Sequence, residues 1–251
     1  MRIPLEPEHG YHIFNRGNGG HRTFFSDENY RYFLMKYAQY MKDYWDTYAY
    51  CLLPNHFHLA IRVKPAASVL AAGIRDFETA DRKLVSRLEK DLPNLGDLAN
   101  LNLDVDALAD LRNLADFVNL ASHHEALRTY LAAWVVSERF RRFLLGYAKA
   151  LNKERGQTGS LFQKIFRRRL VADDDGFQTL LMYIHRNPLH HQVAPDWEAY
   201  TWSSYRSYLS ALPSALPRVE VLNRFGGRQA FVATHREYAD DWKMIQRYIM
   251  E

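Results

Sequence analysis

Two histidines stand two positions apart in the segment Pro54-Asn55-His56-Phe57-His58-Leu59. The apolar residues from His56 to Val63 predict a strand, and side chains at i and i+2 of a strand leave the same face. Both imidazoles could then reach one metal ion. An isolated His-x-His also fits two rings that bond backbone carbonyls or water. Because two imidazoles leave a catalytic ion incompletely coordinated, a metal site here needs a further protein ligand.

Tyr183 and Asn187 stand four positions apart in a segment predicted to be a helix that ends before Pro188. Residues at this spacing share one helix face, with about 6 Å between their Cβ atoms. Asn187 offers a carbonyl oxygen to a hard ion, and Tyr183 offers a phenolate nucleophile beside it. Taken alone, Tyr183 also fits a half-buried core aromatic and Asn187 a helix C-cap.

Patterns of apolar and capping residues predict the elements that position these groups. In chain order they are a strand at Tyr11–Phe14, a helix at Asp27–Tyr44 capped by Ser26, strands at Thr47–Leu53 and His56–Val63, a helix at Ser137–Glu154, a strand at Phe166–Val171 and a helix that starts at Asp173-Asp174-Asp175. With residues 66–128 set aside, the order is that of a ferredoxin-like βαββαβ core. We therefore expect an α+β fold with a four-stranded antiparallel sheet and helices on one face.

Composition divides the chain into three parts. Residues 66–128 are rich in Leu, Ala and Asp and predict a helical insertion. The core is then 1–65 with 129–188, and 189–251 form an extended, aromatic and basic C-terminal tail. The insertion should be peripheral, away from the path of the phosphates.

The net charge of +4 conceals an uneven distribution. Between Trp134 and Leu170 there are ten Lys or Arg against two Glu, whereas between Glu89 and Asp116 there are seven acids against two bases. The first region suits an anionic partner and the second does not.

The sequence argues against a disulfide, a secretory signal and a membrane span. Cys51 is the only cysteine, and no apolar run approaches the ~20 residues that cross a bilayer. We expect a cytoplasmic protein without membrane contact.

Together these segments resemble a known family. The His56-Phe57-His58 strand looks like the His-hydrophobic-His motif of HUH single-strand endonucleases, and Tyr183-Ile184-His185-Arg186-Asn187-Pro188 resembles the Tyr-x-x-x-Asn-Pro helix of the REP-associated tyrosine transposases. Further matching stretches follow in the family's order, at Tyr11–Gly17, Gly159–Gln163, Phe166-Arg167 and Trp202–Tyr205.

The resemblance implies a DNA transposase-like enzyme that cleaves and rejoins single-stranded DNA. His56, His58 and Asn187 would hold Mg²⁺ or Mn²⁺, and Tyr183 would attack the scissile phosphate to leave a 5′-phosphotyrosine. The substrate would be single-stranded or hairpin DNA from a repeat element. Residues 1–65 and 129–188 would form the nuclease core, 189–251 would bind DNA, and the protein would be nucleoid-associated. The candidate DNA contacts are Asn15, Arg16, Arg142, Lys149, Lys164, Arg167, Arg169, Trp202, Ser203, Ser204 and Tyr205. On the fourth strand, Arg167 and Arg169 should share one face and Arg168 the other.

Two features depart from the family. The insertion is longer than expected, and Leu189-His190-His191-Gln192 replaces a small basic run with glycine. Because no partner spacing accompanies them, we expect His190 and His191 to be surface residues and not ligands.

Two other functions stay open. One is a domesticated, non-catalytic binder of repeat DNA or RNA. The other is a metal-dependent phosphoesterase, which would usually carry a second His-x-His motif, and the sequence has none. The recognition sequence and the choice between monomer and homodimer are also left open.

Overall fold

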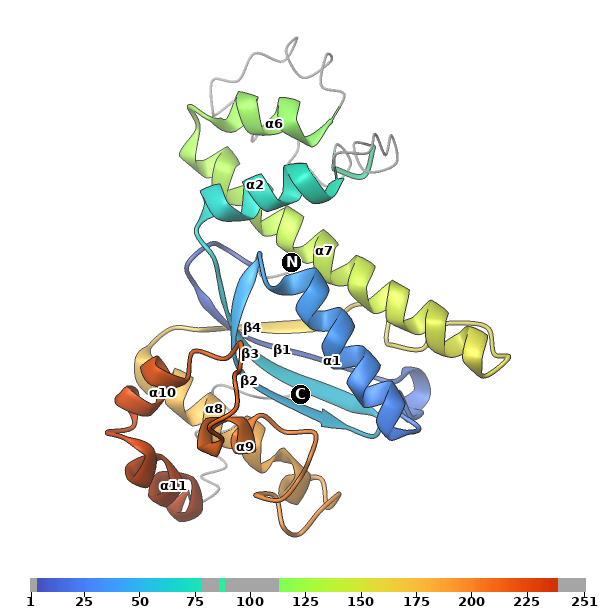
Figure 1. The fold of residues 1–251 in the computed structure, drawn as a ribbon. Helices are drawn as coiled ribbons and strands as arrows, with labels where there is room; N and C mark the ends of the chain where they lie inside the picture. Colours follow the sequence, from blue (N-terminus) through green and yellow to red (C-terminus); the bar gives the residue numbers. More distant parts are fainter. Residues whose placement is uncertain (1–3, 78–85, 89–112, 239–251) are drawn as a thin grey trace.

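A four-stranded sheet forms the centre of the molecule (Figure 1). The computed structural model describes residues 4–77, 86–88 and 113–238. The strands are β1 (Gly10–Arg16), β2 (Trp45–Leu53), β3 (His56–Val63) and β4 (Arg167–Val171), in the order β2-β3-β1-β4. Every pair of neighbours is antiparallel. The predicted α+β, ferredoxin-like core is confirmed.

Helices α1 (Asp27–Met41) and α7 (Glu125–Glu154) cover one face of the sheet. Ser26 caps α1, because its side chain accepts the N–H of Asn29. The helix ends at Met41 and not at Tyr44, and Trp45 already begins β2. The core on this face is strongly aromatic, with Phe33, Phe57, Phe140, Phe143 and Tyr147 in direct ring contact.

The opposite face of the sheet is covered by α8 (Asp174–His190). Ala49, Cys51 and Ala60 present small, fully buried side chains to it, so that a helix can approach the strands closely. Three short helices complete this layer, α9 (Tyr205–Leu209), α10 (Arg218–Arg224) and α11 (Arg228–Glu237) (Figure 1). The sequence predicted helices on one face of the sheet. Helices α1 and α7 do share one face, but α8 covers the other.

Helix α8 does not end before Pro188, as the sequence predicted, but continues through it to His190. Proline lacks an N–H and so removes one backbone bond from the last turn. Two other bonds hold that turn: the N–H of His191 reaches the carbonyl of Asn187 at 3.0 Å, and the side-chain amide of Asn187 reaches the carbonyl of Tyr183 at 2.9 Å. The motif residues therefore belong to one continuous helix.

The predicted insertion contributes α2 (Ala66–Phe77) and α6 (Leu114–Ala121), which lie at the end of α7 away from α8–α11 (Figure 1). Helix α7 begins at Glu125 and not at Ser137, so it extends from this region into the sheet layer. At Gly73 a β-carbon would lie 2.8 Å from Cγ1 of Val135, which shows how closely α2 packs on α7. Residues 78–85 and 89–112 of the insertion, and most of its acidic segment, lie outside the described residues.

The segment Trp202–Ser204 lies along the outer edge of β2. The N–H of Leu52 donates to the carbonyl of Trp202, and the N–H of Ser204 donates to the carbonyl of Tyr50, both at 2.9 Å. A strand edge left open would template pairing with another chain, so this segment protects it. Across the described ranges, no helix combines the length and the apolar character that crossing a membrane requires.

A buried chain of hydrogen bonds joins α11, α8 and β2. Nδ1 of His235 lies 2.7 Å from the carbonyl of Phe231, which only accepts, so Nδ1 carries the proton and Nε2 is an acceptor. Nδ1 of His185 then donates to that Nε2 at 2.8 Å, and the hydroxyl of Ser204 donates to Nε2 of His185 at 2.9 Å. The hydroxyl oxygen of Ser204 in turn accepts the N–H of Tyr50. This arrangement requires both histidines to be neutral.

We expect acid to destabilise the protein through this chain. Burial lowers the pKa of His235 to about 4, and burial with the neighbouring His235 lowers the pKa of His185 well below its usual value. In the unfolded chain both titrate near pH 6.5, so below neutral pH the unfolded state binds more protons. The free energy of unfolding should fall between pH 7 and pH 5, by roughly 2 kcal/mol from His235 alone.

Urea unfolding at pH 7, 6 and 5 would measure this loss. His235→Gln should flatten the pH dependence, whereas His9→Ala, which changes an exposed histidine, should keep the wild-type slope. Equal wild-type stability at pH 7 and pH 5 would contradict the assignment.

Candidate active site

The two motif histidines lie on the sheet face that α8 covers. In the β1–β3 register, His58 is opposite Phe14 and His56 is opposite Arg16, and opposed residues of an antiparallel pair share a face. His58 is completely buried and His56 is 9% exposed. Phe57, between them, points into the aromatic core on the other side. The predicted alternation is confirmed.

Neighbouring side chains define which nitrogen of each imidazole faces the site. Nδ1 of His56 lies 2.6 Å from Oδ1 of Asn55, which only accepts, so this nitrogen carries the proton. Nδ1 of His58 lies 2.9 Å from Nε2 of His12, a fully buried residue of β1. When Nε2 of His12 accepts this bond, Nδ1 of His58 carries the proton and Nε2 of His58 carries the lone pair. Nε2 of His56 carries a lone pair in the same way, and a metal ligand needs such a lone pair. No sequence pattern indicates the contact between His58 and His12, because the two residues come from different strands.

Helix α8 brings Tyr183 against these rings. The Tyr183 ring meets the His58 ring edge-on, with centroids 5.8 Å apart, and the His12 ring in the same way at 6.2 Å. The ring of His190 stacks on its other side at 5.3 Å. Tyr183 is only 6% exposed. The candidate nucleophile therefore lies beside the candidate metal ligands.

Asn187 is one helical turn beyond Tyr183 and is completely buried. Its amide nitrogen donates to the Tyr183 carbonyl, whereas its Oδ1 has no hydrogen-bond partner among the described residues. A buried amide oxygen without a donor is costly unless something else satisfies it. A divalent cation would satisfy this oxygen, and imidazole nitrogens with an amide oxygen are a donor set that can hold one.

A third histidine joins the pair. The ligand atoms of His56, His58 and His191 all lie within 4.8 Å of one another, and the described residues contain no other such group of His, Cys, Asp or Glu. His191 is exposed, as expected, but its ring lies 4.3 Å from that of His56. Tyr183, Asn187 and His191 are spaced i, i+4 and i+8. That spacing could have revealed His191, had Pro188 not been interpreted as the end of the helix.

A cavity of about 430 Å³ opens beside the histidines. Arg167 lines it together with His56 and His191, and Arg16 lies at its margin. Arg169 is opposite His12 on the same face of the sheet, whereas Arg168 points the other way and donates to Ser137. The predicted division of these arginines between two faces is confirmed, and cationic groups flank the site.

The remaining candidate DNA contacts divide into exposed and buried residues. Lys149 and Lys164 are exposed, while Asn15 is buried and donates to the carbonyl of Gln163. Arg142 donates to the buried carboxylate of Glu138 and lies over the ring of Phe77, so it serves the packing of α2 on α7.

The Trp202–Tyr205 segment is engaged within the fold. Trp202 stacks on Tyr30, with ring centroids 4.6 Å apart. Ser203, Ser204 and Tyr205 are at most 3% exposed, so their side chains are not on the surface where DNA would lie. The expectation that these three contact DNA is therefore not supported by their burial, and the segment instead fastens the tail to β2.

Two other tyrosines lie in segments that could carry a nucleophile, Tyr147 in the basic helix and Tyr205 in the aromatic tail. The hydroxyl of Tyr147 donates to the carbonyl of Thr23 in the opposite core, and burial raises its pKa. Burial raises the pKa of Tyr205 to about 12. Both are buried away from the motif histidines.

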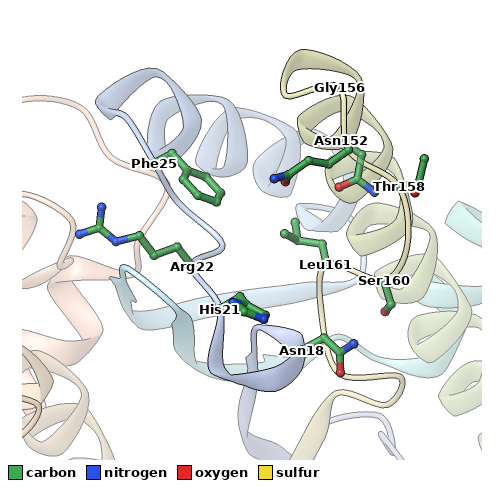
Figure 2. Close-up of a pocket in the computed structure, with 10 residues that line it drawn as sticks. Asn18, His21, Arg22, Phe25, Asn152, Gly156, Thr158, Ser160 and Leu161 are labelled. Atoms are coloured by element: carbon green, nitrogen blue, oxygen red, sulfur yellow. The ribbon is translucent and has the colours of Figure 1, made fainter.

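A larger hollow, of about 690 Å³, lies at the turn that follows β1 (Figure 2). Polar side chains line it, among them Asn18, His21, Arg22, Asn152 and Ser160. Its lining includes neither Tyr183 nor the motif histidines, whereas the smaller cavity is lined by His56.

Comparison with known proteins gives one structural likeness. No protein-family model matches the sequence, and no curated protein matches it. Among solved structures, the chain is similar to one described as a REP-associated tyrosine transposase bound to a REP hairpin. The likeness covers 86% of this chain and 87% of that chain, with a TM-score of 0.49 and 10% identity. At these values it does not decide the activity, which has to be argued from the site.

We expect divalent-ion binding to depend on both motif histidines. His56→Ala and His58→Ala should each abolish the heat of Mn²⁺ binding in calorimetry without DNA, because each removes a ligand nitrogen. His9→Ala, on an exposed histidine, should bind as the wild type does. Undiminished Mn²⁺ binding by well-folded His58→Ala would refute the assignment.

Proposed function

We propose that this protein cleaves and rejoins single-stranded DNA through a covalent bond to Tyr183. The observation that carries the proposal is the contact of Tyr183 with His58 and His12, on the helix that also carries Asn187 and that His191 follows directly. A tyrosine beside a cluster of imidazoles suits phosphoryl transfer, because the tyrosine supplies a nucleophile and the imidazoles can hold a cation.

In the proposed reaction, Oη of Tyr183 forms a bond to the scissile phosphorus while the bond from phosphorus to the 3′ oxygen breaks. The phenol loses its proton, and the departing oxygen gains one to become a 3′-hydroxyl. The product is a 5′-phosphotyrosine. Because this ester conserves the energy of the phosphodiester, attack by a 3′-hydroxyl can join a strand without ATP.

The proposed metal is Mg²⁺ or Mn²⁺, held by His56, His58 and the Oδ1 of Asn187. When bound, the ion supplies electrostatic stabilisation of the charge that develops on the phosphate. The protein groups set the geometry: Asn55 and His12 orient the two imidazoles, and α8 holds Tyr183 against them.

The proposed substrate is single-stranded or hairpin DNA from a repeat element. Arg16, Arg167 and Arg169 border the histidine face, and Lys149 and Lys164 add exposed positive charge. In this proposal residues 1–65 and 129–188 form the nuclease core, 66–128 a peripheral insertion and 189–251 a tail that supports DNA binding.

One observation favours a second candidate, a non-catalytic binder of repeat DNA or RNA. Tyr183 is 6% exposed, so a phosphodiester would have to displace the residues that cover it, such as His190. Detection of a covalent protein–DNA adduct separates the two functions.

The Tyr183→Phe variant tests the proposal. Removing the hydroxyl deletes the nucleophile but keeps the ring and its packing, so hairpin DNA should bind about as well as to the wild type. No denaturation-resistant adduct and no free 3′-hydroxyl end should form with labelled hairpin DNA and Mn²⁺. Tyr32→Phe, on helix α1, is the matched control and should form the adduct. An adduct with well-folded Tyr183→Phe would place the nucleophile elsewhere.

Binding should also weaken as salt increases. If ~5 phosphates of a single strand are neutralised, the logarithm of the binding constant should fall with the logarithm of salt concentration with a slope near −3.5. Fluorescence anisotropy with the Tyr183→Phe variant would measure the slope without cleavage. A slope near zero would argue against a groove that follows the phosphates.

A further inference from the structure

We propose that His191 is a third imidazole ligand of the metal site, and that the site therefore prefers Mn²⁺, Co²⁺ or Zn²⁺ to Mg²⁺. This inference rests on the metal site of the proposed function and changes which ions that site should prefer. It concerns a residue that the motif resemblance leaves out, because the family usually has a small basic run with glycine at this place.

The three imidazoles are close enough for one ion to unite them. Their ligand nitrogens lie within 4.8 Å of one another, and the His191 ring is 4.3 Å from that of His56 and 6.2 Å from that of His58. Ligand bonds of about 2.0–2.1 Å place two nitrogens of a tetrahedral site roughly 3.4 Å apart. His56 and His58 are held by the strand and by their Nδ1 bonds, whereas the His191 side chain is exposed, so a change of its position would have to close the remaining gap.

The backbone holds His191 at this position. Its N–H bonds to the carbonyl of Asn187, and its φ and ψ of −92° and 9° continue the helical turn. Gln192 then takes a left-handed φ of 54°, which ends the helix. The carbonyl of Pro188 accepts the N–H groups of both Val193 and Ala194. The chain therefore turns away directly after His191 and leaves its ring beside His56.

The donor set decides which ion is preferred. Mg²⁺ favours oxygen ligands and is usually bound through carboxylates. No Asp or Glu belongs to this cluster among the described residues, and the one oxygen available from α8 is the Oδ1 of Asn187. Imidazole suits zinc and cobalt best, and Mn²⁺, although the weakest binder among the first-row transition ions, accepts nitrogen ligands more readily than Mg²⁺ does. Three imidazoles with one amide oxygen thus disfavour Mg²⁺ more strongly than two would.

Metal titration of the full chain without DNA tests the inference. Calorimetry should give a wild-type Mn²⁺ affinity at least about tenfold higher than that for Mg²⁺, and Co²⁺ should give a visible absorption spectrum of nitrogen coordination. His191→Ala should lower the affinities for Mn²⁺ and Co²⁺ by about tenfold or more and alter the Co²⁺ spectrum, with little change for Mg²⁺.

His190→Ala is the matched control. His190 is adjacent but stacks on Tyr183, and it is not part of the three-histidine group, so this variant should keep the Mn²⁺ affinity and the Co²⁺ spectrum. His191→Gln is a second variant at the same position. It should keep the wild-type melting temperature, so a loss of Mn²⁺ affinity in this variant cannot come from unfolding. Wild-type Mn²⁺ affinity in His191→Ala, or a wild type that binds Mg²⁺ as tightly as Mn²⁺, would overturn the inference.

The adduct assay distinguishes this inference from the proposed function. If the wild type and His191→Ala form equal amounts of adduct with Mg²⁺ and bind Mn²⁺ equally, His191 is not a ligand and the cleavage function stands. If His191→Ala loses Mn²⁺ binding but the wild type forms no adduct, the ligand assignment stands and the proposed function fails.

Discussion

The alternation of side chains along β3 is the constraint on which the rest of the structure depends. His56, His58 and Ala60 face α8, while Phe57, Leu59 and Ile61 enter the aromatic core beneath α1 and α7. Both faces are covered. A shift of the β3 register by one residue would therefore place the imidazoles in an apolar core and large apolar side chains at the site. Pairing with β1 holds this register and supplies His12, which orients His58.

Helix α8 uses its different sides for different purposes. Tyr183, Asn187 and His191 repeat every fourth residue toward the histidines, whereas His185 is bonded to His235 and Ser204 within the layer formed by the tail. The tail therefore helps to position the helix that carries the candidate nucleophile. This explains why Ser203, Ser204 and Tyr205 are buried: they attach the tail to β2, and α8 rests in part on that attachment.

The charges around the site suit a polyanion. The imidazoles of His56 and His191 line the cavity, and arginines from β1 and β4 stand at its border. No carboxylate joins the histidine cluster within the part of the chain that the structure describes. An ion held there would keep most of its positive charge for the substrate, which a phosphodiester could then help to neutralise.

The sequence by itself determined the features that depend on local periodicity. A strand places His56 and His58 on one face and a helix places Tyr183 near Asn187, because these spacings match the repeats of the two structures. The order of the elements was enough to predict the ferredoxin-like sheet. Only the tertiary structure decided that His12 supports His58, that α8 covers the face opposite α1 and α7, and that His191 approaches His56. These contacts join residues far apart in the chain, and no local repeat encodes them. The continuation of α8 through Pro188 is a separate case. The bonds that hold its last turn are local, from His191 to Asn187 and from Asn187 to Tyr183, but the sequence prediction ended the helix at the proline.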